Sequence, residues 1–469
     1  MISSPPLMEF ASLTRSLGAR FVSHSGKSGF FSVSIDSRSI QEGALFVALC
    51  GSSTDGHRFL REAFACGAGS AMVDSSKLEQ FNILQTAQTM GKDLVIVDNT
   101  LQGLQDTARV FLEGFPGLLK IGITGSSGKT TVKEITAAII GIEKNVVMNS
   151  GNLNSETGLP LSVFSVRSCH EVGIFEMGMN RKGEISELAH VLKPNIALIT
   201  NIGSAHIGII GSKDNIALEK KNIFSFFTGK QTALIPAFDP YCDFLSQGVN
   251  GNVQLYGADS FEELQTVTDR GLEGTEILWA DQKIHFGLCG AYNVSNALAA
   301  IAIAKTAGVS NNAIKRGLES VKPLFGRTEI VNGRATVIRD CYNANPESFA
   351  RAIEFCDSLK WPGRKVYVAG NMGELGTQSR AAHENAGRLL ENSKADKIFL
   401  FGDEMAQAAQ FLDSKDFYHT ISIDELSQAM EKYILDGDLV LLKGSRSCAL
   451  ERVCSLPVFT SQKETIDAA

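Results

Sequence analysis

Short apolar runs separated by Gly, Ser and Asp turns recur through the first hundred residues. Three runs are rich in Phe, Val, Leu and Ile, which is typical of strands; they lie at residues 30–35, 44–49 and 93–98. A helical pattern follows from about residue 101 to 113, and a Gly-Phe-Pro-Gly turn ends it. The pattern predicts a small N-terminal α/β domain over residues 1–113.

The next two hundred residues alternate apolar strands with helical segments. Residues 172–176 and 196–200 are examples of the strands. Such alternation is typical of parallel strands joined by crossover helices. We therefore predict a central α/β domain over residues 114–322, with a mainly parallel sheet.

The pattern of strands and helices restarts after Lys322-Pro323. Strands are expected at residues 335–341, 365–369, 398–401 and 439–442, with helices from residue 346 and near residue 380. The order predicts a Rossmann-like C-terminal domain over residues 323–469. Its glycines do not form the G-x-G-x-x-G motif, so a dinucleotide site is not expected there. The fold class is thus α/β with three domains.

Composition excludes several classes of protein. With 44% hydrophobic and 20% charged residues the chain is typical of globular proteins, and no apolar run approaches the ~18 residues of a membrane helix. A net charge of −7 argues against nucleic acid as the main partner. The nine Cys lack C-x-x-C spacing, and residues 1–10 do not resemble a signal peptide. We expect a monomeric cytoplasmic protein with reduced thiols and no membrane span.

Residues 118–134 run from an apolar strand through a tight Gly/Ser turn into a helix that opens with Lys-Thr-Thr. Backbone N–H groups of such a turn point into one concavity that binds phosphates. The Lys129 ammonium can lie between two phosphates, and the Thr130 hydroxyl can hold the accompanying Mg²⁺. The segment predicts an ATP site made by Gly125, Ser126, Ser127, Gly128, Lys129, Thr130 and Thr131. Ile123 stands where the general motif has its first Gly.

Two further polar side chains are expected at the same edge of the central sheet. Glu176 ends one apolar strand, and His206 follows another through a short loop. The carboxyl ends of parallel strands border the ligand crevice, so Glu176 can reach a metal near the phosphates. A solvated acid and a surface histidine are the alternatives.

Lys220 is predicted to lie on the inward face of a helix that begins near Asp214. It shares that face with three apolar residues at helical spacing, Ile216, Ile223 and Phe227. Burial disfavours the ammonium form and so lowers the pKa of a lysine. The alternative is a buried stem whose ammonium reaches solvent.

Two strand-to-helix turns of the third domain offer anion sites. Asn345 is a favourable N-cap and Pro346 a favourable first helical residue, and the free N–H groups there suit a carboxylate. The capping role of Asn345 does not account for the polar residues Asp340 and Asn343 that precede it. Residues 443–446, Lys-Gly-Ser-Arg, offer two cations for a second anion, with solvated turn residues as the alternative.

Six segments, in order over essentially the whole chain, resemble the Mur ligases, the ATP-dependent amide-forming enzymes of peptidoglycan assembly. They are Thr-Gly-Ser-Ser-Gly-Lys-Thr-Thr-Val-Lys-Glu (124–134), Gly-Asn-Leu-Asn with Gly-Leu-Pro (151–154 and 158–160), Glu-Met-Gly-Met-Asn-Arg-Lys-Gly-Glu-Ile (176–185), Asp-x-Tyr-Asn-Ala-Asn-Pro (340–346), Met-Gly-Glu-Leu-Gly (372–376) and Lys-Gly-Ser-Arg (443–446). Six ordered matches in two domains are hard to obtain by chance, and the glycine spacing before Lys129 is the form that this family uses.

The resemblance implies a reaction and its substrates. D-alanyl-D-alanine would be joined to UDP-N-acetylmuramoyl-tripeptide through an acyl phosphate, with release of ADP and phosphate. Diaminopimelate, lysine and other diamino acids all remain open as the third peptide residue. Because ATP and the substrates would be held by different domains, closure of the third domain is expected to assemble the site.

The resemblance also implies roles for individual residues. Lys129 would contact the ATP phosphates. One Mg²⁺ would lie between Thr130 and Glu176. A second Mg²⁺ would lie between His206 and a carbamylated Lys220.

Further contacts with nucleotide and substrates are implied in the same way. Those with adenine, ribose or phosphate involve Asn293, Asn296, Arg327 and Asp340. The uridine diphosphate would be held by Ser37, Arg38, Asp55 and His57 of the first domain. Further substrate candidates are Asn152 and Asn154, together with Asn343 and Asn345 where the dipeptide is expected.

Two departures from the family pattern affect local contacts. Tyr292 stands where a His is frequent, and residues 205–211 lack the acid that often follows His206.

The alternatives to this function are, among the ligases, other enzymes of the same architecture, such as a folylpolyglutamate synthase or the ligase that adds the third peptide residue. A P-loop switch or motor, and an inactive binding protein, are the alternatives outside the ligases.

Overall fold

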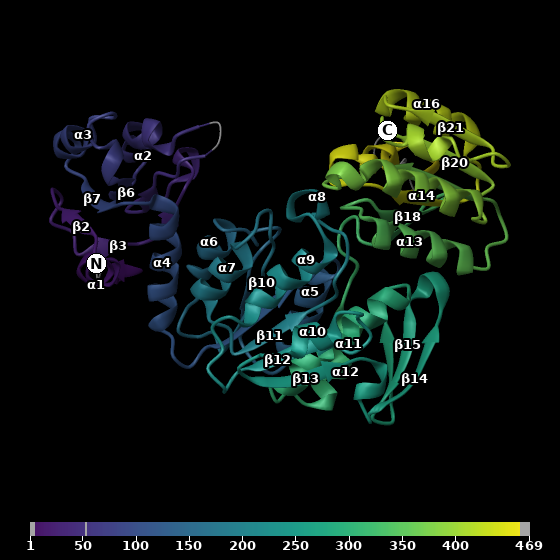
Figure 1. The fold of residues 1–469 in the computed structure, drawn as a ribbon, viewed down its shortest axis with the longest axis horizontal. Coiled ribbons are helices and arrows are strands. Elements are labelled where there is room, and N and C mark those ends of the chain that lie inside the picture. Colours follow the sequence, from purple (N-terminus) through teal and green to yellow (C-terminus); the bar gives the residue numbers. More distant parts are fainter. Residues whose placement is uncertain (1–4, 52–53, 460–469) are drawn as a thin grey trace, which may run out of the picture.

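The computed structural model describes residues 5–51 and 54–459; residues 1–4, the start of the N-terminal segment considered above, lie outside the described residues, as do 52–53 and 460–469. The chain forms three α/β domains, each built around its own sheet (Figure 1). The predicted fold class is confirmed. None of the helices in the described ranges is long and apolar enough to cross a lipid bilayer.

The first domain has a five-stranded sheet in the order β2-β7-β6-β5-β4, parallel except for β2. Its strands are β2 (Arg20–Val22), β4 (Val33–Ser34), β5 (Leu45–Val47), β6 (Ser70–Asp74) and β7 (Asp93–Val97), and β1 (Met8–Glu9) pairs with β3 (Gly29–Phe30) beside it. Its helices are α1 (Phe10–Leu17), α2 (Leu60–Ala65), α3 (Ile83–Met90) and α4 (Thr100–Glu113). The single strand expected at residues 30–35 is wrong, because the chain there is divided between β3 and β4.

Helix α4 joins the first domain to the central one (Figure 1). It packs against α6 (Gly158–Val163) and α7 (Glu184–Leu192) of the central domain. The rings of Phe111 on α4 and Phe164, the residue after α6, have centroids 5.5 Å apart. Burial of such large aromatic side chains favours a fixed arrangement of the two domains.

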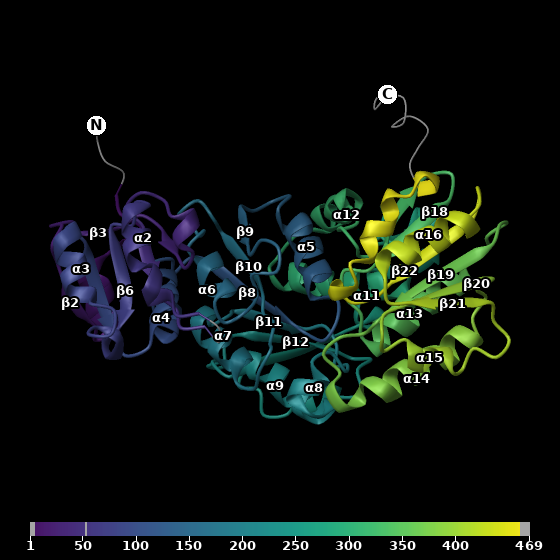
Figure 2. The ribbon, with the colours of Figure 1, turned by 90° about the horizontal axis from the view of Figure 1, so that it is seen from above.

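The central domain has a six-stranded, fully parallel sheet in the order β13-β12-β11-β8-β10-β9. The strands are β8 (Leu119–Thr124), β9 (Val146–Met148), β10 (Val172–Glu176), β11 (Ile196–Ile199), β12 (Thr232–Pro236) and β13 (Asn252–Tyr256). Helices α5 (Lys129–Ile140), α11 (Ala291–Thr306) and α12 (Asn311–Ser320) cover one face, and α7, α8 (Ile207–Ile210) and α9 (Lys213–Lys221) the other (Figure 2). The short α10 (Cys242–Ser246) lies beside β12. The predicted parallel sheet is confirmed.

A second sheet in the same region departs from the expectation of parallel strands alone. Strands β14 (Leu264–Asp269), β15 (Thr275–Trp279) and β16 (Gln282–Phe286) form an antiparallel three-stranded sheet. The alternation of buried and partly buried side chains in β15 is typical of a sheet with one face packed on the core. Residues with positive φ close the two hairpins: Gly271 and Gly274 lie between β14 and β15, and Ala280 and Asp281 lie between β15 and β16.

The third domain has a six-stranded sheet in the order β17-β18-β22-β19-β20-β21, parallel except for β17. The strands are β17 (Glu329–Asn332), β18 (Thr336–Asp340), β19 (Lys365–Gly370), β20 (Lys397–Phe401), β21 (Phe417–Thr420) and β22 (Leu439–Lys443). Helices α13 (Pro346–Ser358) and α14 (Ser379–Glu391) lie on one face with the short α15 (Ala406–Ala409), and α16 (Ile423–Tyr433) lies on the other. The predicted strands and helices are confirmed within one or two residues.

The register of both large sheets brings the predicted polar residues to their carboxyl edges. In the central sheet Glu176 lies beside Ile123, and Ile199 beside Thr124. In the third sheet Asp340 lies beside Lys443. Segments that follow these strands in the two domains are in contact with each other, so the carboxyl edges of the two sheets face one cavity.

Candidate active site

The cavity between the central and third domains has a volume of about 410 Å³. It collects most of the residues that the sequence marked as candidates. Those that line it are Ser126, Ser127, Gly128, Lys129, Thr130, Thr131, Asn152, Asn154, Glu176, His206, Asn293, Asn296, Arg327, Asp340, Asn343 and Asn345. Gly125 and Lys220 are not in its lining, nor are the four candidates of the first domain, Ser37, Arg38, Asp55 and His57.

The turn between β8 and α5 forms the cradle that the sequence predicts. Gly125 and Gly128 have φ of 150° and 84°, and a Cβ on Gly125 would lie 1.8 Å from Thr200 Oγ1. Thr200 Oγ1 donates to Ser127 O at 2.6 Å, while Ser127 N donates to Asn201 Oδ1 at 3.1 Å. The residues after β11 therefore fix the turn, and the first N–H groups of α5, which have no partner within the helix, are left for phosphate oxygens.

Lys129 and Lys220 both donate to the carbonyl oxygen of Gly125, at 2.8 and 3.0 Å. Both ammonium groups are thus next to the cradle. Burial lowers the pKa of Lys129, and the charge of Glu176 opposes that shift. The neutral carbonyl oxygen does not compensate the charge of Lys129, which therefore remains available to a polyphosphate.

Lys220 is buried as predicted, with 1% of its surface exposed. Burial holds its pKa well below the usual range of a lysine, and repulsion from Lys129 adds to this. The adjacent Glu219 gives it no ion pair, because the Glu219 carboxylate accepts from Gly183 N and Ile185 N. The expected helix is shorter than predicted: α9 ends at Lys221, and the apolar residues beyond it lie in a following turn and loop.

Thr130 and Glu176 supply a pair of oxygen ligands at the cradle. Thr130 Oγ1 donates to Glu176 Oε2 at 2.7 Å, and Arg327 Nη2 donates to Thr130 Oγ1 at 3.0 Å. Asn154 Nδ2 donates to Glu176 Oε1 at 2.6 Å. Glu176 is 2% exposed, so these contacts replace water around its carboxylate. Hydroxyl and carboxylate oxygens are the donors that Mg²⁺ prefers, and this donor set fits that ion.

His206 comes from the loop after β11, as predicted, and precedes α8. Its Nδ1 lies 2.6 Å from Oε2 of Glu374, a residue of the third domain. The sequence analysis did not single out Glu374, although it lies within a matched segment. No local pattern could have paired it with a residue 168 positions earlier.

The adenine-side candidates form a connected wall of the cavity. Asn293 Nδ2 donates to Cys289 O at 2.8 Å, and Asn296 Nδ2 donates to Asn293 Oδ1 at 3.1 Å. Asp340 pairs with Lys443 at 2.8 Å. The guanidinium of Arg327 lies 4.2 Å from the ring centre of Tyr342, a cation–π contact that orients it.

Asn345 is the N-cap of α13, as the sequence predicts. Its Oδ1 accepts from Ser348 N at 2.8 Å, and Ser348 Oγ accepts from Asn345 N at 3.0 Å, which completes a capping box. Its Nδ2 donates to Ser127 Oγ of the cradle at 3.0 Å. Asn345 therefore links the helix to the cradle, while Asn343, whose amide oxygen accepts from Ala344 N, lines the cavity beside it.

Glu347, the second residue of α13, makes the densest set of contacts across the two domains. Its carboxylate accepts from Ser204 N at 3.1 Å, from Ser204 Oγ at 2.7 Å and from Lys213 Nζ at 2.8 Å. Hydrogen bonds from Lys213 and Ser204 outweigh burial and lower the pKa of Glu347. Sequence reasoning missed this residue; the one local signal was an acid in the first turn of a capped helix.

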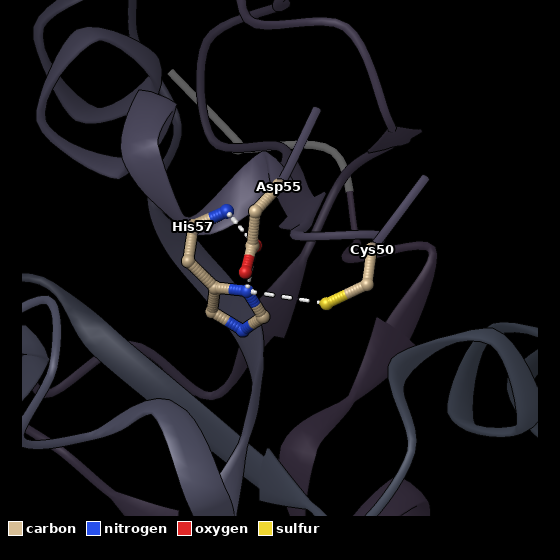
Figure 3. Close-up of side chains that lie close together, drawn as sticks. All are labelled: Cys50, Asp55 and His57. Carbon is tan, nitrogen blue, oxygen red and sulfur yellow. Dashed lines mark hydrogen bonds and ion pairs between the residues drawn. The ribbon is translucent and has the colours of Figure 1, made fainter. Parts of the chain in front are cut away.

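The first-domain candidates form a separate group, away from the cavity. Asp36 pairs with Arg38 at 2.8 Å, and Ser37 between them is buried. Asp55 and His57 lie close to Cys50, which the sequence analysis did not consider (Figure 3). The assignment of the uridine diphosphate to this domain stays a prediction.

Cys50, Asp55 and His57 have the ligand types of a metal site, but their hydrogen bonds oppose one. Asp74 N donates to His57 Nε2 at 2.9 Å, so that nitrogen carries no proton. The ring proton is therefore on Nδ1, which lies 2.6 Å from Asp55 Oδ1 (Figure 3). A metal on Nδ1 would leave the ring without a proton. We conclude that His57 positions Asp55 and the start of the turn after β6.

Comparison with known proteins gives consistent results over the three domains. The model of the Mur ligase family, catalytic domain, matches residues 31–111; that of the Mur ligase middle domain matches 123–304, and that of the Mur ligase, glutamate ligase domain, matches 326–446. The UDP-N-acetylmuramoyl-tripeptide--D-alanyl-D-alanine ligase of Treponema pallidum is 42% identical over 440 residues, covering 93% of this chain and 95% of that one.

Solved structures agree. A MurF crystal structure from Acinetobacter baumannii superposes with a TM-score of 0.85 at 26% identity, covering 97% of this chain and all of the other. The MurF ligase of Thermotoga maritima in complex with ADP superposes with a TM-score of 0.76 at 28% identity, covering 93% of this chain and 98% of that one.

Removal of the Glu347 carboxylate should loosen the docking of the third domain. Hydrogen bonds to a charged group contribute about 1.5–3 kcal/mol each, so Glu347→Ala should lower the equilibrium constant for docking about tenfold or more. Small-angle X-ray scattering would then give a larger radius of gyration than for the unaltered protein. Glu354→Ala, an exposed acid on the same helix, is the matched control. Identical scattering from the two variants would contradict the docking role.

Proposed function

The chain belongs to the Mur ligase family, and from this we propose that it is an ATP-dependent ligase that joins D-alanyl-D-alanine to UDP-N-acetylmuramoyl-tripeptide in peptidoglycan precursor synthesis. One observation carries the proposal: the phosphate cradle of the central domain and the capped turn of the third domain line a single cavity. A site for activating a carboxylate and a site for an amine-bearing substrate are thereby brought together. A switch or motor would need the first of these alone.

Activation requires ATP because a carboxylate at neutral pH is a poor electrophile. The terminal carboxylate of the tripeptide attacks the γ-phosphorus, giving an acyl phosphate and ADP. Lys129 and the first N–H groups of α5 hold the phosphates in line for this transfer. Thr130 and Glu176 would hold Mg²⁺, whose charge offsets that on the transferring oxygens.

The amine of D-alanyl-D-alanine then attacks the acyl carbon, and phosphate leaves from the tetrahedral intermediate. Asn343 lines the part of the cavity where we place the dipeptide, and Asn345 holds that wall against Ser127 of the cradle. Contacts of Glu347 and Asn345 with the central domain hold the two domains together. This excludes water from the acyl phosphate until the amine attacks.

We further propose the division of labour among the domains. Residues 1–113 bind the UDP-sugar, through Ser37, Arg38 and Asp55. Residues 114–322 bind ATP, and Asn293 and Asn296, together with Arg327 and Asp340 from the start of the third domain, contact its adenine, ribose or phosphate. Residues 323–469 bind the dipeptide. Asn152 lines the cavity and is assigned to the tripeptide, whereas Asn154 acts on Glu176. We propose that the protein is a cytoplasmic monomer.

ADP release tests the function. The purified protein should release ADP when ATP, UDP-N-acetylmuramoyl-tripeptide and D-alanyl-D-alanine are all present, and much more slowly when either acceptor or dipeptide is omitted. Tripeptides that end in diaminopimelate and in lysine should be compared. Release driven by a single amino acid in place of the dipeptide would identify one of the rival ligases instead.

Lys129→Ala should lower kcat at least about 10²-fold, the scale for loss of one fixed donor at a developing charge. Steady-state ADP release under saturating substrates measures this. The matched control is Lys230→Ala, which changes an exposed lysine of the central domain and should leave kcat unchanged. A Lys129→Ala enzyme of normal kcat would refute the role of the cradle.

We also propose that Lys220 is carbamylated and that it shares a second Mg²⁺ with His206. The support is a buried amine whose lowered pKa favours the neutral form, which is the form that reacts with CO₂. As an amine Lys220 offers Mg²⁺ no oxygen; as a carbamate it offers two.

The carbamate predicts a dependence on CO₂. Protein depleted of CO₂ should lose activity, and bicarbonate should restore it. With ¹³C-bicarbonate, carbon NMR should show a carbamate signal that is missing from Lys220→Ala. A signal of equal intensity in both proteins would place the carbamate on another amine, and no signal in either would show that Lys220 is not modified.

A further inference from the structure

His206 and Glu374 meet across the boundary between the central and third domains. Their side chains are 2.6 Å apart, from Nδ1 to Oε2. The main chains are also joined, because Gly208 N donates to Glu374 O at 3.0 Å. Both residues line the cavity with Lys129 and Glu176. The third domain thus adds a carboxylate to a part of the site that otherwise belongs to the central domain.

Both residues are held in an unusual backbone conformation. His206 has φ of 64° and Glu374 has φ of 63°, a region that residues with a Cβ rarely adopt. A close approach of main chains holds them there: a Cβ on Gly208 would lie 2.5 Å from Gly376 N. Backbone strain of this kind persists where the surroundings impose it, which is frequent at functional sites.

The contact determines which ring nitrogen of His206 carries the proton. His206 Nδ1 has no partner at regular hydrogen-bond geometry, but a nitrogen and a carboxylate oxygen 2.6 Å apart would repel each other if both were unprotonated, so a proton lies between them. Nδ1 therefore carries the ring proton. In the neutral imidazole Nε2 is left with its lone pair, which is the form that ligates a metal. Carboxylates that accept the second N–H of a ligating histidine fix its ring and tautomer in this way.

We propose that Glu374 is a positioning residue that the third domain supplies to His206, fixing the imidazole so that Nε2 is the nitrogen offered to a divalent cation. The inference rests on the proposed function, which assigns His206 to the second cation. Because Glu374 reaches His206 only when the domains are docked, cation binding at His206 and docking are linked, and each favours the other.

The test follows Mn²⁺, which accepts imidazole as well as oxygen ligands, in protein with ¹⁵N-labelled histidine, ADP and bicarbonate. Electron spin echo spectroscopy of the bound Mn²⁺ should show a ¹⁵N coupling that His206→Ala abolishes. Glu374→Ala should weaken Mn²⁺ binding at this position by about 10–100-fold. Glu374→Gln should retain most of the affinity, because its amide oxygen still accepts from Nδ1. The matched control, Glu431→Ala on α16, should change nothing.

Two results would overturn the proposal. One is unchanged Mn²⁺ affinity and unchanged ¹⁵N coupling in Glu374→Ala; the other is a coupling in the unaltered protein that survives His206→Ala. Neither result affects the function, which ADP release by the unaltered protein reports independently. If ADP release does not depend on the dipeptide while Glu374→Ala still weakens Mn²⁺ binding, the proposed function fails and the positioning role stands.

Discussion

The cavity depends on one contact between the domains. In it, α13 and the segment around Glu374 pack against the residues that follow β11. Residues 200–213 touch the cradle on one side, through Thr200 and Asn201, and the third domain on the other, through Ser204 and Lys213. One segment thus supports the phosphate-binding turn and receives the domain that carries the second substrate. If it were displaced, the cradle and the docking surface would be lost together.

The charges in the cavity match it to a polyphosphate. Lys129 and Lys220 both donate to the carbonyl oxygen of Gly125, and Arg327 donates to the hydroxyl of Thr130. Glu176 is held by hydrogen bonds and does not form an ion pair with either lysine. The positive charge of Lys129 and Arg327 is matched to a polyphosphate, whereas burial, with repulsion from Lys129 added to it, lowers the pKa of Lys220.

Local signals in the sequence were sufficient for much of the fold and part of the site. A strand, a Gly/Ser turn and Lys-Thr-Thr determine the cradle within about ten residues, and Asn345-Pro346 marks the start of α13 because a capping box is itself local. Helical spacing placed Lys220 inside the protein. These features need no knowledge of the distant chain.

The remaining contacts arise between residues far apart in sequence, where periodicity and capping carry no information. Glu347 meets Ser204, and Glu374 meets His206, only because two sheets face each other at their carboxyl edges. Asn154, for which a substrate contact is predicted, also donates to Glu176 through its amide, a contact between residues 22 positions apart that no local pattern indicated. The antiparallel sheet of β14–β16 was missed because its three strands follow one another without helices between them and form a sheet of their own, which the expected alternation of strands and helices did not cover.

The central claim is that this cavity activates a carboxylate by phosphoryl transfer before the amine attacks. The most direct test uses UDP-N-acetylmuramoyl-tripeptide with ¹⁸O in its terminal carboxylate, together with ATP and D-alanyl-D-alanine. Because the carboxylate oxygen that attacks phosphorus leaves with the phosphate, mass spectrometry should find one ¹⁸O atom in each phosphate released. Phosphate without ¹⁸O, formed while the amide product accumulates, would contradict the account.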